Sequence, residues 1–269
     1  MDAAHWNGPA GATWVDQADA LDTMLEQLGR AAMDLLHLRS GQAVVDIGCG
    51  SGATARELFR RVSPGGRVLG VDVSEPLIRA AERNGGGPHW QLADAGCETI
   101  DGARYDAAFS RFGLMFFDDP RAALAHIRLA LEPKGTLAFV CWRTAAENAW
   151  AVDAAAALKA VHGVDQPPVD PHAPGPFAFG DGDRLRGLLA SAGWSDIHVH
   201  AHNTDYVIGP TVEAAVELAL RIGPAARPIR ELGLDPGPFR DTLSRALGAK
   251  LTPRGVVQDA AVWLVTANA

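Results

Sequence analysis

The sequence predicts an α/β protein with a doubly wound, Rossmann-like sheet of mostly parallel strands. Apolar runs alternate with helical segments five times between residues 44 and 142, and parallel neighbouring strands need such crossover connections. Three glycines directly follow the first apolar run, and polar residues follow several of the later ones. Because ligands of open α/β sheets bind at the carboxyl ends of the strands, these positions predict one shared crevice.

The composition is typical of a soluble protein that acts on a small molecule. The chain has 269 residues, of which 48% are hydrophobic, and no apolar run approaches the ~18 residues of a membrane span, so we expect no membrane insertion. Residues 1–6 lack the basic and apolar regions of a secretory signal, and we therefore expect a cytoplasmic protein. The net charge of −8 argues against nucleic acid as a partner, whereas a homodimer stays open.

The segment before the first strand predicts a lid. Residues 6–11 are loop-like, and a helix is expected from about Val15 with leucines on one stripe. Trp6 and Trp14 lie before that helix or at its start, where they either anchor the segment to the core or contact a ligand. We take Trp14 as a candidate cofactor residue.

The glycine turn predicts a site for a nucleoside-containing cofactor. Residues 44–47 suit a strand that is buried on both faces, and glycines at every second position let the backbone bend and approach a ligand. The helix that follows presents free N–H groups to whatever lies over the turn. The candidate contacts in the turn are Gly48, Cys49, Gly50 and Ser51.

Two cofactors compete for this pattern. The spacing fits a dinucleotide fingerprint, which would indicate an NAD(P)-linked oxidoreductase, and it also fits S-adenosyl-L-methionine. Asp46 precedes the first glycine, and an acid there suits the amino group and sulfonium of S-adenosyl-L-methionine better than a pyrophosphate. We therefore favour S-adenosyl-L-methionine, with Asp46 among its contacts.

Polar residues at later strand ends point to the same crevice. A strand over residues 67–72 ends in Asp72, about 20 residues after the glycine turn, where a carboxylate accepts both ribose hydroxyls or merely caps the next helix. Asp94 and Ala95 follow a short strand at residues 89–93 and suit an adenine ring. Ser110 and Arg111 follow the strand that begins at residue 105.

The pattern changes after a fifth strand at residues 136–142, which follows a helix from residue 120 that residues 133–135 end. A helix at about 150–162 and a proline-rich stretch at 166–176 predict a helical cap over the substrate, with a surface linker as the alternative. Further elements are expected after it: a helix at 183–192, a strand at 195–202, helices at 211–222 and 239–247 joined by a loop, and a final strand at 260–266.

Three histidines share one face of the expected strand at residues 195–202. His198, His200 and His202 lie at period two, but no Asp, Glu or Cys beside them completes a metal shell on what we take for an edge strand. We expect a solvated face and no metal.

With these features in order, the chain resembles the class I S-adenosylmethionine-dependent methyltransferases, and more narrowly the small-molecule enzymes grouped with ubiquinone and menaquinone biosynthesis. The resemblance is best over residues 6–142, and residues 110–117 and 261–265 also look like that group. It implies a seven-stranded sheet with the last strand antiparallel. It also implies that the glycine turn holds the methionine part and Asp72 the ribose. The remaining implied contacts are Val73 and Leu77 around the adenine, Asp94 and Ala95 on the adenine, and Ser110 and Phe112 on the methionine side.

We therefore expect a methyltransferase that moves a methyl group to an O, N or C atom of a small molecule by in-line displacement. Besides the oxidoreductase, a non-catalytic binder of S-adenosyl-L-methionine or a cyclase with the same fold is the alternative. We assign no catalytic residue. Candidate acceptor contacts are Arg111, Trp142, Arg143 and His172.

The expected organisation has four parts. They are an N-terminal lid (1–40), the cofactor-binding core (41–143), a cap insertion (144–180), and the rest of the sheet (181–269) with a helical insertion at about 211–250.

Overall fold

A computed structural model describes residues 3–102, 104–166, 170 and 173–269. Its sheet follows the order β3-β2-β1-β4-β5-β8-β6, with a short β7 paired to β8 beside this path. The strands are β1 Ala43–Ile47, β2 Arg67–Asp72, β3 His89–Leu92, β4 Tyr105–Arg111, β5 Leu131–Trp142, β6 Ser195–Gly209, β7 Leu251–Thr252 and β8 Gly255–Asn268. No helix in the described part of the chain is both long and apolar enough to cross a membrane.

The central strands are parallel and buried. β1 pairs in parallel with β2 on one side and β4 on the other, and every residue of β1 is buried. Such strands are covered on both faces by their crossover helices, which explains their nearly continuous apolar sequence. The last strand, β8, pairs antiparallel with both β5 and β6. The predicted fold class, with its seven-strand path and antiparallel last strand, is confirmed.

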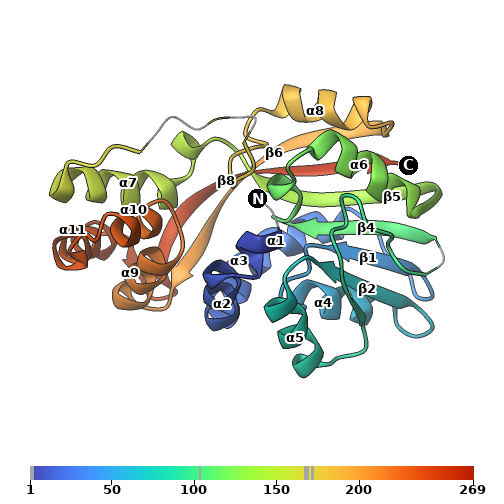
Figure 1. Cartoon of the computed structure of the whole chain (residues 1–269), viewed down its shortest axis with the longest axis horizontal. Helices are drawn as coiled ribbons and strands as arrows, with labels where there is room; N and C mark the ends of the chain where they lie inside the picture. The colour runs from blue at the N-terminus through green and yellow to red at the C-terminus, as the bar shows by residue number, and fades with distance from the viewer. Residues whose placement is uncertain (1–2, 103, 167–169, 171–172) are drawn as a thin grey trace.

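Helices cover both faces of this sheet. α4 and α5 lie on one side and α6 and α8 on the other, as expected where the chain first winds from β1 towards β3 and then from β4 towards β6 (Figure 1). The helices are α1 Ala3–Trp6, α2 Pro9–Asp16, α3 Ala18–Asp34, α4 Ala53–Val62, α5 Glu75–Asn84, α6 Pro120–Leu129, α7 Ala149–His162, α8 Gly182–Ser191, α9 Val212–Arg221, α10 Ala226–Glu231 and α11 Pro236–Gly248, with 3₁₀ turns at Leu114–Phe116 and Ala145–Glu147.

Some helices begin directly after a capping side chain. Asp119 accepts a hydrogen bond from the Ala122 N–H at the start of α6, and Asp235 does the same for Gly237 at the start of α11. A proline occupies the first turn of both helices, where its missing N–H costs nothing.

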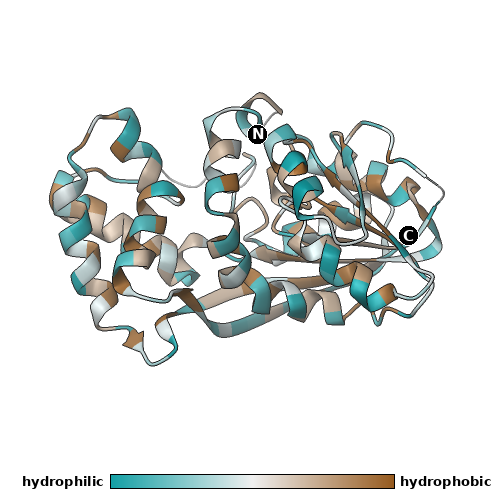
Figure 2. Cartoon of the chain, turned by 90° about the horizontal axis from the view of Figure 1, so that it is seen from below, coloured by the Kyte–Doolittle hydropathy of each residue, from teal (hydrophilic) through white to brown (hydrophobic). Residues whose placement is uncertain are grey.

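β6 and β8 continue well past the sheet as a two-stranded ribbon. β8 pairs with β5 only from Asn268 to Val262, but its pairing with β6 runs on to Val256. Helices α7, α9, α10 and α11 gather on this extension (Figure 1), and Figure 2 shows the long strands joining that helical group to the sheet. Teal and brown residues alternate around these helices, as expected for helices with one buried face (Figure 2).

Several predicted boundaries were wrong. Within residues 6–11, which were expected to be a loop, only residues 7 and 8 form a turn, because α1 ends at Trp6 and Pro9 starts α2. Gly11 of α2 passes so close to Trp6 that a Cβ there would lie 1.9 Å from its carbonyl oxygen. The segment 223–238 contains α10.

β5, β6 and β8 are longer than expected. β5 already pairs with β4 at Leu131, five residues before its predicted start, and α6 ends at Leu129. The extended parts of β6 and β8 hydrogen-bond to each other, a stabilisation that local sequence does not reveal.

Candidate functional site

The glycine turn connects β1 to α4 through left-handed backbone conformations. Gly48, Gly50 and Gly52 have φ of 69°, 55° and 87°, a region that favours glycine. The turn is tied to β2, because the N–H groups of Gly48 and Cys49 both donate to the carbonyl oxygen of Val71, at 2.9 and 3.1 Å. A Cβ on Gly48 would lie 3.0 Å from the Cα of Gly113, whereas one on Gly50 would meet no protein atom within 4 Å. Gly50 therefore leaves open space over the turn.

Asp72 faces this open space from the end of β2. Its two carboxylate oxygens accept hydrogen bonds from the Gly50 N–H at 2.8 Å and the Ser74 N–H at 2.9 Å. Burial raises the pKa of the Asp72 carboxyl. Each carboxylate oxygen retains a second lone pair, so Asp72 can still accept hydrogen bonds from a ligand.

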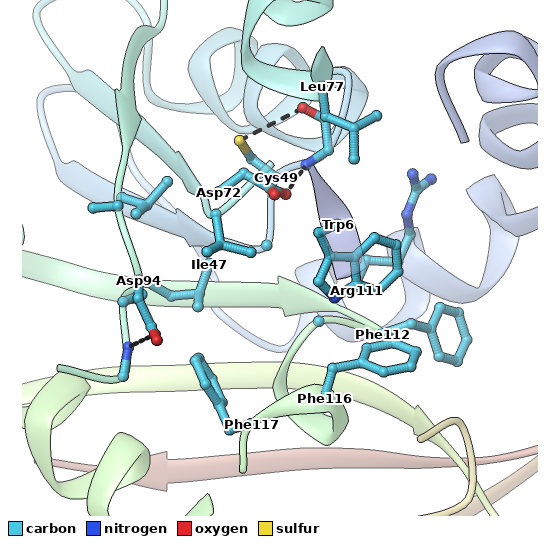
Figure 3. Close-up of a pocket in the computed structure, with 18 of the residues that line it drawn as sticks. Trp6, Ile47, Cys49, Asp72, Leu77, Asp94, Arg111, Phe112, Phe116 and Phe117 are labelled. Carbon is cyan, nitrogen blue, oxygen red and sulfur yellow. Dashed lines mark hydrogen bonds between the residues drawn. The ribbon is translucent and has the colours of Figure 1, made fainter. Parts of the chain in front are cut away.

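A cavity of about 370 Å³ lies over these residues. Figure 3 shows Asp72, Asp94 and Phe117 around the same opening, with Trp6, Phe112 and Phe116 grouped at its other end. Eleven of the thirteen predicted cofactor residues line it: Trp14, Gly48, Cys49, Gly50, Ser51, Asp72, Val73, Leu77, Asp94, Ala95 and Phe112.

Two predicted cofactor residues, Asp46 and Ser110, do not line this cavity. Asp46 is completely buried beneath the turn, where its Oδ2 accepts a hydrogen bond from the Thr54 hydroxyl at 2.6 Å. Burial raises the pKa of Asp46 to about 7. Ser110 is also fully buried, and its hydroxyl donates to the Ile47 carbonyl oxygen at 2.8 Å. Both side chains brace the turn from below.

Asp22 and Arg111 close the cavity from the side of α3. They form an ion pair with both side chains largely buried, and the Ser51 hydroxyl donates to Asp22 at 3.0 Å. This pair joins α3 to β4 and to the glycine turn. Arg111, an expected acceptor contact, lines the first cavity instead.

Some lining residues were not predicted as ligand contacts, namely Asp22, Phe116 and Phe117. Asp22 directly follows Leu21 in the apolar stripe of α3, which indicated only a surface position. Phe116 and Phe117 lie in the segment 110–117 that resembles the methyltransferase group, but the resemblance assigns no ligand contact to either ring. The sequence allows Trp6 either an anchoring role or a ligand contact. Its ring lies 5.4 Å from that of Phe116, measured between centroids.

A second cavity, of about 830 Å³, adjoins the first and lies between the helical group and the sheet. The two share a wall of six residues: Trp6, Trp14, Leu21, Leu25, Phe112 and Phe116. Beyond that wall, Trp142 stacks on Phe112 with ring centroids 4.5 Å apart. The size of the second cavity and its mostly apolar lining suit a small organic molecule.

The remaining expected acceptor contacts do not all lie at the second cavity. Trp142 lines the second cavity, whereas Arg143 lines neither. The Arg143 guanidinium pairs with Glu147, donates to Asn203 at 2.9 Å, and lies over the Trp263 ring. His172 lies outside the described residues.

The three histidines of β6 carry no metal signature. His198 and His200 are exposed, and the His198 ring lies 3.0 Å from an Asp196 carboxylate oxygen. Among the residues that the structure describes, no group of three His, Cys, Asp or Glu side chains is placed to hold a metal ion.

The part of the chain around the first cavity is similar in sequence to known methyltransferases. Residues 45–139 match the family described as "Methyltransferase domain". Nocamycin O-methyltransferase of Saccharothrix syringae is 32% identical over 115 residues, which are 41% of this chain and 41% of that protein. Malonyl-[acyl-carrier protein] O-methyltransferase of Pseudescherichia vulneris is 32% identical over 117 residues, 42% of this chain and 45% of that protein. Each match thus spans less than half of the relative.

A solved structure shares the fold over the entire chain. Phosphoethanolamine N-methyltransferase 2 of Haemonchus contortus, solved in complex with S-adenosyl-L-methionine, superposes with a TM-score of 0.59 at 15% identity. The superposition covers 100% of this chain and 60% of that protein. The family match ends before the β6–β8 ribbon and its helices, where the second cavity is built.

Proposed function

We propose that the whole chain moves a methyl group from S-adenosyl-L-methionine to a small molecule. The premise is that residues 45–139 are a class I methyltransferase domain with this cofactor. The observation that carries the proposal is the pair of adjoining cavities with one shared wall. In-line transfer needs a methyl donor and an acceptor that meet in this way.

The donor set around the first cavity fits the cofactor. The open space above Gly50 accommodates a ligand pressed against the turn, and Asp72 offers carboxylate oxygens suited to ribose hydroxyls. We assign Asp94 and Ala95 to the adenine, and Phe112 and the glycine turn to the methionine part. Asp46 and Ser110 then act indirectly, by supporting the turn.

When bound, the cofactor supplies a methyl group that its sulfonium has already activated. The chain therefore has to orient two ligands and exclude water. Trp6 and Trp14 contact each other with ring centroids 5.6 Å apart and line both cavities, so we assign them to covering the junction. We assign no general base, because one is needed only where the acceptor atom must lose a proton.

The same proposal covers the partners of the protein, its location and the roles of its outer helices. A net charge of −8 supports a small-molecule acceptor and no nucleic-acid partner, and the proposed location is the cytoplasm. Helices α7 and α9 to α11 take the role of the substrate cap, and residues 3–40 that of a lid.

Calorimetric titration with S-adenosyl-L-methionine, S-adenosylhomocysteine and NADH tests the cofactor, and Asp72→Asn tests its placement. We expect both sulfur compounds and not NADH to bind. Asp72→Asn should weaken this binding by about 10- to 100-fold, through loss of charge-assisted hydrogen bonds.

Asp106→Asn is the matched control, because Asp106 also accepts a backbone N–H, that of Ala43 at 2.7 Å, but lies at the opposite end of its strand. Unchanged affinity in Asp72→Asn would remove the ribose assignment. Preferential binding of NADH would overturn the function.

A further inference from the structure

One end of the second cavity carries a polar cluster, formed by Trp150, Asp153, Tyr206 and Gln258. Tyr206 of β6 and Gln258 of β8 are direct cross-strand partners, so their side chains share one face of the ribbon. The Gln258 amide nitrogen donates to the Asp153 carboxylate at 2.5 Å. Asp153 and Trp150 lie one turn apart on α7. Elements distant in sequence thus bring these four residues together.

The cluster has hydrogen-bonding capacity that the described residues do not satisfy. Gln258 is only 3% exposed, yet its Oε1 accepts no hydrogen bond from the residues that the structure describes, and the buried indole nitrogen of Trp150 donates none to them. Within the described chain, no group bonds the hydroxyl of Tyr206, which is 2% exposed. Because a buried polar group without a partner costs about 1–3 kcal/mol, such groups beside a cavity indicate that something else satisfies them.

The direction of each missing bond is fixed. An indole N–H can only donate, so Trp150 needs an acceptor oxygen. Asp153 holds the amide nitrogen of Gln258, so the free amide atom is the oxygen, which needs a donor. Burial raises the pKa of Tyr206, so its hydroxyl stays neutral and can serve in either role.

The cluster favours a neutral ligand. Asp153, its only charged member, already forms an ion pair with Lys250. The other described charged residues that line the cavity are exposed and lie outside the cluster: Asp165, Arg221, Arg227, Arg230 and Glu231. A charged ligand group buried at the cluster would therefore find no unpaired opposite charge among these four residues.

Aromatic rings continue from the cluster to the shared wall. The Trp142 ring lies 5.4 Å from that of Trp150, 6.1 Å from that of Tyr206 and 4.5 Å from that of Phe112, measured between centroids. Such a row of rings suits a flat, ring-containing molecule that extends from the cluster towards the first cavity.

We propose that the polar cluster selects the methyl acceptor: a neutral, ring-containing molecule whose carbonyl-type oxygen accepts from Trp150 and whose O–H or N–H donates to Gln258. This inference rests on the proposed function, since it concerns the acceptor side of the same site. It assigns Trp150 and Gln258 to binding and specificity rather than to the transfer itself.

Four naphthalenes test the inference by calorimetry on the full chain saturated with S-adenosylhomocysteine. 6-Acetyl-2-naphthol carries a carbonyl and a hydroxyl group, 2-acetylnaphthalene only the carbonyl, 2-naphthol only the hydroxyl, and naphthalene neither. We expect 6-acetyl-2-naphthol to bind at least about tenfold more tightly than naphthalene.

Two variants then separate the two hydrogen bonds. Trp150→Phe should weaken the two acetyl compounds by about 5- to 10-fold and leave 2-naphthol unchanged. Gln258→Met should weaken the two hydroxyl compounds and leave 2-acetylnaphthalene unchanged. Trp263→Phe is the control, because its indole N–H already donates to the Gly180 carbonyl oxygen at 3.0 Å and Trp263 lines neither cavity.

The outcomes separate the inference from the function on which it rests. If S-adenosylhomocysteine binds but no probe binds, or the probes bind equally well, or Trp150→Phe weakens all four alike, the polar cluster holds ordered water only and the inference is wrong. If S-adenosylhomocysteine itself fails to bind, the proposed function fails instead. Should Gln258→Met not fold, as judged by thermal unfolding, Trp150→Phe decides alone.

Discussion

The buried side chain of Asp46 makes the stability of the folded protein depend on pH. It lies directly under Gly48, it is fully buried, and its only hydrogen-bond donor among the described side chains is Thr54. Desolvation raises its pKa to about 7, so near neutrality the folded protein holds a proton that the unfolded chain releases.

We therefore expect Asp46→Asn to change the pH dependence of stability. Between about pH 4 and pH 7 the unfolded chain binds fewer protons at this position, so its contribution to the free energy of unfolding falls as pH rises and levels off above pH 7. Asparagine does not titrate. Across that window the variant should gain up to about 4 kcal/mol relative to the native protein. Urea unfolding at pH 5, 6, 7 and 8 measures this, and parallel curves for the two proteins would contradict it.

Gly50 is the second residue whose substitution has a specific expected effect, here on cofactor binding. Gly50→Ala should weaken binding of S-adenosylhomocysteine by about 5- to 100-fold, because the added methyl group occupies the open space over the turn. Gly41→Ala is the control: Gly41 also has positive φ, with no atom within 4 Å of a Cβ, but lines neither cavity. Both variants should lose about 1–2 kcal/mol of stability from the left-handed backbone. Equal cofactor affinity in the two would refute the assignment.

At the scale of elements, α3 is the part of the lid segment that packs against the sheet. Leu21, Leu25 and Leu28 bury its apolar stripe. Gly29 lets Arg111 cross the helix closely, since a Cβ there would lie 2.7 Å from the Arg111 Cδ. The guanidinium thereby reaches Asp22, which also accepts from Ser51 in the glycine turn.

Asp22→Asn should therefore destabilise the protein by about 1–3 kcal/mol, because it leaves a largely buried guanidinium without its counter-charge. The loss is read from urea unfolding, and hydrogen exchange should become faster in α3. Asp19→Asn in the same helix is the control; Asp19 is exposed in the first turn, and its loss should cost only a few tenths of a kcal/mol. Similar losses in both variants would mean that the ion pair contributes nothing.

At the scale of the whole molecule, the β6–β8 ribbon decides where the acceptor cavity forms. It carries α7 and α9 to α11 away from the sheet (Figure 1). Residues of that helical group, of the sheet and of the N-terminal helices together line the cavity. Trp6 stands where the two halves meet: its ring contacts Trp14 and Phe116, and its carbonyl oxygen accepts from the Ser74 hydroxyl at 2.9 Å.

Trp6→Ala should consequently affect both cavities. We expect the affinities for S-adenosylhomocysteine and for 6-acetyl-2-naphthol each to fall by about 3- to 10-fold, because one ring contributes to the wall of each cavity. Calorimetry of each ligand measures the change, and Trp263→Phe should leave both affinities unaltered. A loss for only one ligand would show that the cavities do not depend on a common wall.

The sequence alone determined the features that depend on local order. Alternating strands and helices predicted the doubly wound sheet, and glycines at every second position predicted the turn over β1, because both patterns act through backbone geometry. The positions of Asp72 and Asp94 at the cavity followed, since carboxyl ends of parallel strands meet at one edge.

Only the tertiary structure decided which way each side chain faces and what distant segments build together. Asp46 and Ser110 have the right place in the sequence, yet they point beneath the turn, where Asp46 accepts from the Thr54 hydroxyl and Ser110 donates to the Ile47 carbonyl oxygen. The polar cluster joins residues 150, 206 and 258, whose proximity depends on β6 and β8 pairing beyond the sheet. Side-chain direction and long-range pairing are set by packing between distant segments, which no local pattern records.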